Sequence, residues 1–181
     1  GDVYKRQEYV VCTPNRGVTL KPDCKLDGSK NFKFTIKGRS DTDYAKDPDT
    51  RRSVTGDRTS INGSVTHWRS VTQKSVTLSV TEAEQAGCVT CAQDMIFQKQ
   101  ILESIGLQVG LPMILECDNK GAVDLANNWT AGGRTRHVNV RQNWLRELKE
   151  NGILIVQWIA GSENDADMHT KNLGGPAFEK F

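Results

Sequence analysis

The sequence predicts an α/β domain, and three observations lead to that prediction. β-prone residues on both sides of Asn62-Gly63 predict an antiparallel hairpin. An apolar stripe at spacings of three and four between residues 79 and 105 predicts a long helix. The segment from Met113 to Asn128 is typical of a buried strand that passes directly into a helix, as strands of α/β sheets do.

The composition is that of an ordinary globular protein. The chain has 181 residues, of which 36% are hydrophobic and 25% charged, and its formal net charge is +2. This length suits one domain with a sizeable core, and a nucleic-acid binder of this charge would need a local basic face. No run of about 18 apolar residues occurs, and no signal peptide is recognisable. We therefore expect an intracellular, cytoplasmic protein that is neither secreted nor embedded in a membrane.

The cysteines favour a reduced protein. Their odd number and their positions within predicted regular structure argue against a disulfide framework. They are Cys12, Cys24, Cys88, Cys91 and Cys117. Cys88 and Cys91 have the spacing of half a zinc site, but no second pair accompanies them, so we expect them to pack in the core of a helix.

The first thirty residues carry few signals of regular structure. Residues 1–7 show no periodicity, and we interpret them as a non-native or disordered leader outside the fold. Residues 8–30 are rich in turn formers such as Pro14-Asn15-Arg16-Gly17. We expect the domain itself to span residues 31–181.

The first predicted strand begins at Asn31 and leads to Asp41. Apolar side chains alternate along it, and its polar continuation from Gly38 to Tyr44 keeps the register. Two further strands, Arg52–Asn62 and Val65–Val71, follow with connections too short for a crossover helix, so the three form an antiparallel meander. Asp41 then lies near a strand end, either as a turn carboxylate or as part of a site.

The long helix is predicted from Ser79 to Ile105, with Gly106 closing it. Its apolar stripe consists of Cys88, Cys91, Met95, Leu102 and Ile105. Extended backwards at the same spacing, this stripe reaches Glu84. Glu84 can form a capping box with Thr81, but Glu82 can cap from the solvent side. A carboxylate on the buried face is costly unless something pairs with it, so Glu84 is a candidate site residue.

Asp118 comes directly after the apolar strand that starts at Met113, and a helix is predicted from Lys120 to Asn128. The acid therefore lies at the carboxyl end of a strand, where α/β sheets bind their ligands. The alternative is that Asp118 or Asn119 only caps the following helix.

The last part of the chain contains a basic stretch and a fourth acid. The basic residues are Arg134, Arg136, His137 and Arg141. They fit contacts with phosphates or simply a solvated loop and helix start, before a helix from Val138 to Glu150. A strand from Ile153 to Ile159 precedes a last short helix that starts near Gly161. Asp167 lies in its first turn, either as a favourable helix charge behind Asn164 or as a site residue.

The order β-β-β-α-β-α-α-β-α, with acids at these four positions, resembles the RNase H fold. The motifs also resemble the ribonuclease H domain of copia-type LTR retrotransposon Pol polyproteins, over about Lys30 to Phe181. Ser40-Asp41-Thr42-Asp43-Tyr44-Ala45 is similar to S-D-x-D-(W/Y)-A, Arg52-Ser53-Val54-Thr55-Gly56 to R-(R/K)-S-(T/V)-(S/T)-G, residues 73–84 to Q-K-x-V-x-L-S-S-T-E-A-E, residues 117–122 to C-D-N-x-(S/G)-A, residues 134–138 to R-T-(K/R)-H-(I/V), and residues 164–171 to N-x-A-D-x-x-T-K. Tyr9 to Pro14 is similar to the end of the reverse transcriptase region, so residues 8–30 are interpreted as its tail.

The resemblance implies an RNase H-like fold with a five-stranded mixed sheet, three antiparallel strands followed by two parallel ones, flanked by helices. It implies cleavage of the RNA strand of RNA/DNA hybrids during reverse transcription, with the reverse transcriptase domain of the same polyprotein as partner and a virus-like particle as location if the element is active. The implied catalytic and metal-binding residues are Asp41, Glu84, Asp118 and Asp167. Two Mg²⁺ ions, which Mn²⁺ can replace, suit such hard oxygen ligands. Our hypothesis has Asp41 bridging, Glu84 and Asp118 completing one metal site, and Asp167 the other.

The implied nucleic-acid contacts are Asn119, Arg134, Arg136, His137 and Arg141. The sequence departs from the family pattern at Arg39, Gln85, Asn139 and His169. Two alternatives follow: a catalytically decayed module that only binds hybrid, or another two-metal nuclease of this fold, of integrase or resolvase type.

Overall fold

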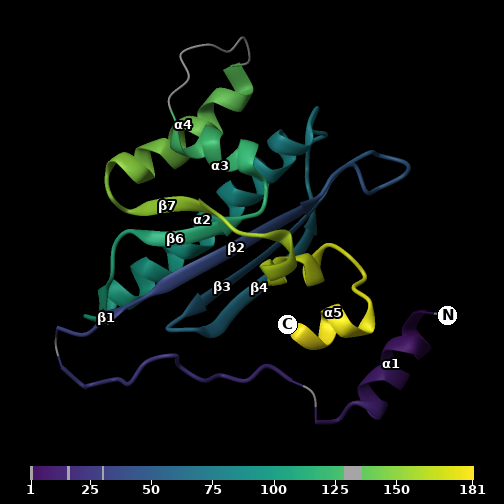
Figure 1. Cartoon of the computed structure of the whole chain (residues 1–181), viewed down its shortest axis with the longest axis horizontal. Helices are drawn as coiled ribbons and strands as arrows, with labels where there is room; N and C mark the ends of the chain where they lie inside the picture. Colours follow the sequence, from purple (N-terminus) through teal and green to yellow (C-terminus); the bar gives the residue numbers. More distant parts are fainter. Residues whose placement is uncertain (1, 16, 30, 129–135) are drawn as a thin grey trace.

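The computed structural model describes residues 2–15, 17–29, 31–128 and 136–181. Figure 1 labels its elements along the chain. They are α1 (Asp2–Cys12), β1 (Lys33–Phe34), β2 (Ile36–Asp43), β3 (Val54–Ile61), β4 (Ser64–Thr72), α2 (Val80–Ser104), β5 (Gln108–Val109), β6 (Met113–Cys117), α3 (Lys120–Asn127), α4 (Arg136–Glu150), β7 (Leu154–Trp158), the 3-10 helices η1 (Gly161–Glu163) and η2 (Asp165–His169), and α5 (Gly175–Lys180).

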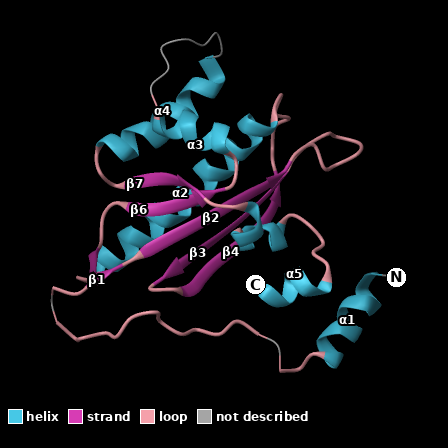
Figure 2. Cartoon of the chain, viewed as in Figure 1, coloured by secondary structure: helices cyan, strands magenta, loops and turns pink. Residues whose placement is uncertain are grey.

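A five-stranded mixed sheet organises the structure, with strand order β4-β3-β2-β6-β7 (Figure 2). β2, β3 and β4 pair antiparallel, whereas β6 pairs parallel with both β2 and β7. Helices flank this sheet, so the fold class expected from the sequence is confirmed. β2 and β6 run in the same direction, so Asp41 near the end of β2 and Asp118 directly after β6 lie at the same edge of the sheet.

The two faces of the sheet are covered by different elements. A Cβ on Gly38 of β2 would meet Met95 and Cys91 of α2, so even-numbered β2 residues face this helix. A Cβ on Gly56, the partner of Asp41 in β3, would meet Thr170, His169 and the carbonyl of Ala166. Odd-numbered β2 residues at this end, Asp41 among them, therefore face η2 and the residues that follow it.

The core lies between α2, the central strands and the pair α3 and α4. Its members include Cys88, Cys91, Met95, Met113, Leu115, Leu145, Leu148, Leu154 and Val156, all buried. Cys88 and Cys91 pack there as free thiols, as expected. The predicted stripe is wrong at Ile105, which is 67% exposed. The helix ends at Ser104 and the chain turns at Gly106 (φ +81°), so Ile105 lies beyond the last buried turn.

The hairpin forms as its sequence predicts. Asn62 and Gly63 both have positive φ, 48° and 78°, which is the conformation of the two-residue turn that follows the twist of paired strands. The Asn62 side chain accepts a hydrogen bond from the Thr35 amide at 2.8 Å. Thr35 interrupts the first predicted strand, which is therefore two strands: β1 pairs with β5, and β2 enters the large sheet.

Both ends of the chain contain helical turns that the sequence patterns do not predict. Residues 2–12 form α1, which Figure 1 shows set apart from the sheet at the end of an extended segment. The expected last helix near Gly161 is instead two 3-10 helices, because the Asn164 side chain accepts from the Ala166 amide and ends one turn while starting the next. Among the described residues, none of the helices has both the length and the apolar character needed to cross a bilayer.

Candidate active site

Four acids from four elements meet at the end of the parallel strands. Asp41 lies in β2, Glu84 in α2, Asp118 directly after β6, and Asp167 in η2. Carboxylate oxygens of Asp41, Asp118 and Asp167 lie within 4.8 Å of one another, and a second group within the same limit contains Glu84, Cys117 and Asp118. The structure therefore brings together all four acids expected from the sequence, and Asp118 connects the two groups.

Asp41 is 1% exposed and is held by residues that follow η2. One of its carboxylate oxygens accepts a hydrogen bond from the Thr170 hydroxyl, and the other lies 3.3 Å from Lys171 Nζ. Burial raises the pKa of Asp41, although the Thr170 hydrogen bond and the Lys171 charge oppose that rise. Asn164 joins the same elements, because its buried amide donates to the Ser40 carbonyl at 3.0 Å.

Glu84 heads the buried face of α2, as its position on the stripe predicts. Its carboxylate accepts from the Thr42 amide at 3.3 Å and from Cys117 Sγ at 3.8 Å. The capping role belongs to Glu82, whose amide donates to Ser79 Oγ and whose side chain accepts from the Leu78 amide. Burial, then Cys117, Asp41 and Asp118, raises the pKa of Glu84 to about 10, so it carries a proton at neutral pH when no metal ion is bound.

Asp118 lies where β6 gives way to α3. Asn119, not Asp118, is the N-cap of α3, because its side chain accepts from the Ala122 amide at 2.9 Å. Burial and the neighbouring Asp41 raise the pKa of Asp118. A Cβ on Gly161 would lie 3.2 Å from an Asp118 oxygen, so a glycine there leaves room beside the carboxylate.

A lysine ammonium already lies among the acids. Lys171 Nζ is 2.9 Å from Asp167 and 3.3 Å from Asp41. Burial opposes the charge on Lys171, but the hydrogen bond to Asp167 and the attraction of Asp41 raise its pKa overall. The site thus attracts a cation to the space between two of its carboxylates.

The donor set fits divalent metal ions of the Mg²⁺ type. Asp41, Asp118 and Asp167 offer hard carboxylate oxygens around a common space, and Glu84 offers another next to Asp118. Cys117 is a soft donor, and its thiol donates to Glu84. The carboxylates rather than the thiol are therefore the residues that would hold Mg²⁺ or Mn²⁺.

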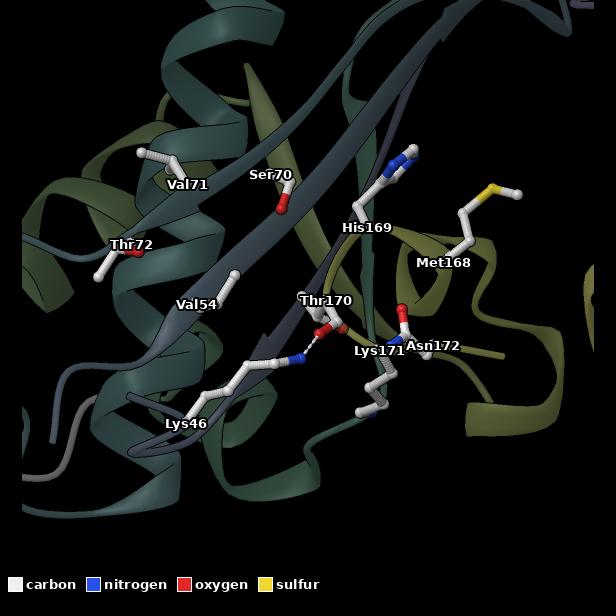
Figure 3. A pocket seen from close by; sticks show the side chains of 10 residues that line it. All are labelled: Lys46, Val54, Ser70, Val71, Thr72, Met168, His169, Thr170, Lys171 and Asn172. Carbon is white, nitrogen blue, oxygen red and sulfur yellow. Dashed lines mark hydrogen bonds between the residues drawn. The ribbon is translucent and has the colours of Figure 1, made fainter. Parts of the chain in front are cut away.

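A hollow of about 340 Å³ adjoins this site on the side of β4 and η2. Figure 3 shows its lining, in which Lys46 reaches across and donates to the carbonyl of Thr170. His169 and Lys171 line this hollow together with the β4 residues Ser70 to Thr72. The sequence motif named Thr170 and Lys171, but not their contacts with Asp41, because contacts between residues about 130 positions apart leave no local periodicity.

The basic stretch lies mostly outside the described part of the molecule. Arg134 is not among the described residues, and neither are the side chains of Arg136, His137 and Arg141, whose backbone begins α4. Of the residues that depart from the family pattern, Arg39 forms ion pairs of 2.7 Å with Glu116 and 2.8 Å with Asp165. These contacts tie β2 to β6 and η2, so a charge at position 39 has a structural role.

Comparisons with solved structures define the class of the fold. The chain aligns with LC11-RNase H1 in complex with an RNA/DNA hybrid at a TM-score of 0.54 and 11% identity, covering 72% of this chain and 89% of that one. It also aligns with the N-terminal RNase H domain of rv2228c from Mycobacterium tuberculosis, at a TM-score of 0.53 and 10% identity, covering 75% and 95%. The structure therefore has the RNase H-like fold.

The sequence relatives of the chain are retrovirus-related Pol polyproteins. The chain is 38% identical over 144 residues to the retrovirus-related Pol polyprotein from transposon TNT 1-94 of Nicotiana tabacum, covering 80% of the chain and 11% of the relative. It is 30% identical over 173 residues to the Pol polyprotein from transposon RE1 of Arabidopsis thaliana, covering 96% and 11%. No protein-family model matches the chain. The resemblance to the RNase H domain of copia-type Pol polyproteins is thus confirmed, and the chain spans about one ninth of the length of these relatives.

Proposed function

We propose that this chain hydrolyses the RNA strand of RNA/DNA hybrids during retrotransposon reverse transcription, as a metal-dependent endoribonuclease. The observation that carries the proposal is the convergence of Asp41, Glu84, Asp118 and Asp167 at one edge of the sheet. The RNA/DNA hybrid bound to the structurally similar LC11-RNase H1 supports this choice of substrate.

The four acids would hold two Mg²⁺ ions, with Mn²⁺ as a substitute. When bound, such ions activate a water molecule and neutralise charge on the scissile phosphate. Asp41 would be a ligand of both ions, Glu84 and Asp118 would complete one site, and Asp167 would complete the other. Asp118 belongs to both acidic groups, so it would be the alternative ligand of both ions.

The chain's own residues prepare this site. Thr170 and Lys171 fix the Asp41 carboxylate, and the Thr42 amide fixes that of Glu84. Glu84 must lose its proton when a cation arrives, because its pKa is about 10 without one. Lys171 must move aside or turn to a phosphate, since its ammonium lies between Asp41 and Asp167.

Substrate contacts and neighbours are also part of the proposal. Asn119 lies beside Asp118 at the start of α3, and the basic stretch of Arg134, Arg136, His137 and Arg141 precedes or begins α4. We assign them contacts with phosphates and 2′-hydroxyls of the hybrid. Residues 8–30 would be the tail of the reverse transcriptase region, and residues 31–181 the RNase H-like domain, acting in the cytoplasm or in a virus-like particle.

The decisive experiment measures cleavage of a labelled RNA/DNA hybrid by the purified chain in Mg²⁺ and in EDTA. We expect Mg²⁺-dependent cutting of the RNA strand, with single-stranded RNA and duplex DNA spared, because recognition needs an A-like groove with 2′-hydroxyls on one strand. Asp118→Asn is the matched variant: it keeps the size of the side chain and the Asn119 cap, and it should abolish cutting.

Each alternative predicts a different result of this experiment. Hybrid binding without Mg²⁺-dependent cleavage would favour a decayed binding module. Equal cutting of duplex DNA would favour a nuclease of integrase or resolvase type. Undiminished cleavage by Asp118→Asn would end the catalytic assignment of that residue.

A further inference from the structure

A second cluster of possible metal ligands lies away from the four catalytic candidates. It joins Asp57 of β3, His67 of β4 and Asp94 of α2. Asp57 pairs with Ser40 in the sheet and therefore faces α2, whereas its neighbour Gly56 faces η2 and the Asp41 side. The two clusters are thus on opposite faces of β3.

The distances within this cluster suit a small cation. His67 Nε2 lies 3.6 Å from Asp57 Oδ1 and 3.4 Å from Asp94 Oδ2, and the three ligand atoms are all within 4.8 Å of one another. In a tetrahedral zinc site with bonds of about 2.0–2.1 Å, neighbouring ligand atoms are about 3.3–3.4 Å apart. The separations of 3.6 and 3.4 Å are close to that spacing and longer than an ordinary hydrogen bond.

Two of the three ligand atoms also lack a hydrogen bond. Asp57 is 0% exposed, and its Oδ1 is buried without a hydrogen-bond partner among the described residues. His67 Nε2 is also buried without a hydrogen-bond partner among the described residues, and it faces the same small space as Asp57 Oδ1. A buried carboxylate oxygen without a partner costs free energy, and a cation bound to both atoms would remove that cost.

Arg69 pairs with both carboxylates of the cluster but leaves one oxygen of Asp57 without a hydrogen bond. Its guanidinium contacts Asp57 Oδ2 at 3.0 Å and also pairs with Asp94 Oδ2, so Asp57 Oδ1 stays free. Two carboxylates against one guanidinium leave one negative charge, which a divalent ion would more than balance. Arg69 therefore acts as the outer partner that orients the ligating carboxylates.

We propose that Asp57, His67 and Asp94 form a binding site for a divalent transition-metal ion of the zinc class, separate from the catalytic acids. An imidazole nitrogen with two carboxylates selects Zn²⁺ over Mg²⁺, because Mg²⁺ prefers oxygen ligands alone. The three ligands come from β3, β4 and α2, so the ion would fasten the outer strands of the sheet to the long helix. With three protein ligands, a fourth position would remain for water.

The test titrates the full chain with Zn²⁺ by calorimetry in excess Mg²⁺, which competes for the catalytic acids, and with reducing agent present. We expect His67→Gln and Asp94→Asn each to weaken zinc affinity at least tenfold. His169→Gln is the matched control: it removes another half-buried imidazole, which lines the hollow beside the catalytic acids, and it should leave zinc affinity unchanged.

A second measurement follows the histidines of the original chain directly. In ¹⁵N-resolved imidazole spectra, one equivalent of Zn²⁺ should shift the Nε2 signal of one histidine, and the absence of that signal from the His67→Gln spectrum assigns it to His67. Unchanged zinc affinity in both His67→Gln and Asp94→Asn would overturn the proposal, and so would an unmoved His67 signal. That second outcome would leave only a histidine packed against two acids that both pair with Arg69.

Discussion

Burial raises the pKa of Asp41, Glu84 and Asp118 before any ligand binds. Glu84 is 4% exposed and its pKa rises to about 10, whereas Asp41, equally buried, has the Thr170 hydroxyl and Lys171 to stabilise its charge. Two acids on neighbouring elements are thus tuned differently by their hydrogen-bond partners. Thr170 and Lys171 are therefore as much a part of the site as the acids.

Replacing Lys171 by Met tests this account. We expect the metal-free protein to lose about 1 kcal/mol of stability, a modest value because the lysine is 42% exposed. Added Mg²⁺ should then stabilise Lys171→Met more than the original, since no ammonium competes for Asp41 and Asp167. Thermal melts in EDTA and in excess Mg²⁺ measure both effects.

Lys99→Met is the control, because Lys99 pairs with Glu103 at 2.8 Å across the same four-residue spacing but far from the acids in sequence. It should respond to Mg²⁺ as the original chain does. If Lys171→Met melts like the original in EDTA, the lysine does not stabilise the metal-free site.

At the scale of elements, the close approach of α2 to β2 positions Glu84. Gly87 lies one turn after Glu84, and a Cβ on it would come within 2.7 Å of Ser40 Oγ and 2.8 Å of Thr42 Oγ1. Any larger residue must push the helix away from the strand that carries Asp41. The contact between Glu84 and the Thr42 amide depends on that approach.

Gly87→Ala should therefore impair both stability and cleavage. Alanine favours the helix by about 1 kcal/mol relative to glycine, but overpacking of this kind costs about 1–3 kcal/mol, so we expect a net loss of about 1 kcal/mol. Urea unfolding and the hybrid cleavage assay measure the two effects. Gly175→Ala, where an added Cβ meets nothing within 4 Å, should change neither. A more stable Gly87→Ala protein with full activity would contradict this view of the packing.

The sequence predicted well those elements that are specified locally. The Asn62-Gly63 turn, the Ser79 cap of α2 and the passage from β6 into α3 each depend on residues a few positions apart. The pairing of β1 with β5 was not predictable, because two-residue strands about 75 positions apart have no periodicity. The two 3-10 helices at residues 161–169 were not predictable, because an Asn such as Asn164 can cap an α-helix or a 3-10 helix. The sequence pattern therefore does not distinguish the two kinds of helix.

At the scale of the whole molecule, the site exists only because distant segments converge. The positions of the four acids could be predicted, since all four lie at strand ends or helix starts that the topology brings to one edge. The environment of these acids could not be predicted. The positions of the Lys171 ammonium and the Cys117 thiol beside the acids, and the burial of Glu84, depend on how the whole structure packs. The cluster of Asp57, His67 and Asp94 escaped the sequence entirely for the same reason.

The stability of the whole protein should depend on pH through Glu84. Its folded pKa of about 10 lies above its ordinary value of 4.5, so its contribution is fully present below pH 4.5 and is lost as pH rises towards 10. Each pH unit within this window removes about 1 kcal/mol in metal-free protein. In EDTA, stability should therefore fall between pH 5 and 8, and Glu84→Gln should flatten that slope. Excess Mg²⁺ should oppose the fall, because the ion binds the charged carboxylate.

The measurement is urea unfolding at several pH values in EDTA and in Mg²⁺. Glu82→Gln is the control, because it removes a carboxylate from the same helix turn but keeps an oxygen that can accept from the Leu78 amide. It should retain the slope of the original chain. If stability falls equally with pH in Glu84→Gln and in the original chain, Glu84 is already ionised without metal. The assignment of a buried proton to Glu84 would then be wrong.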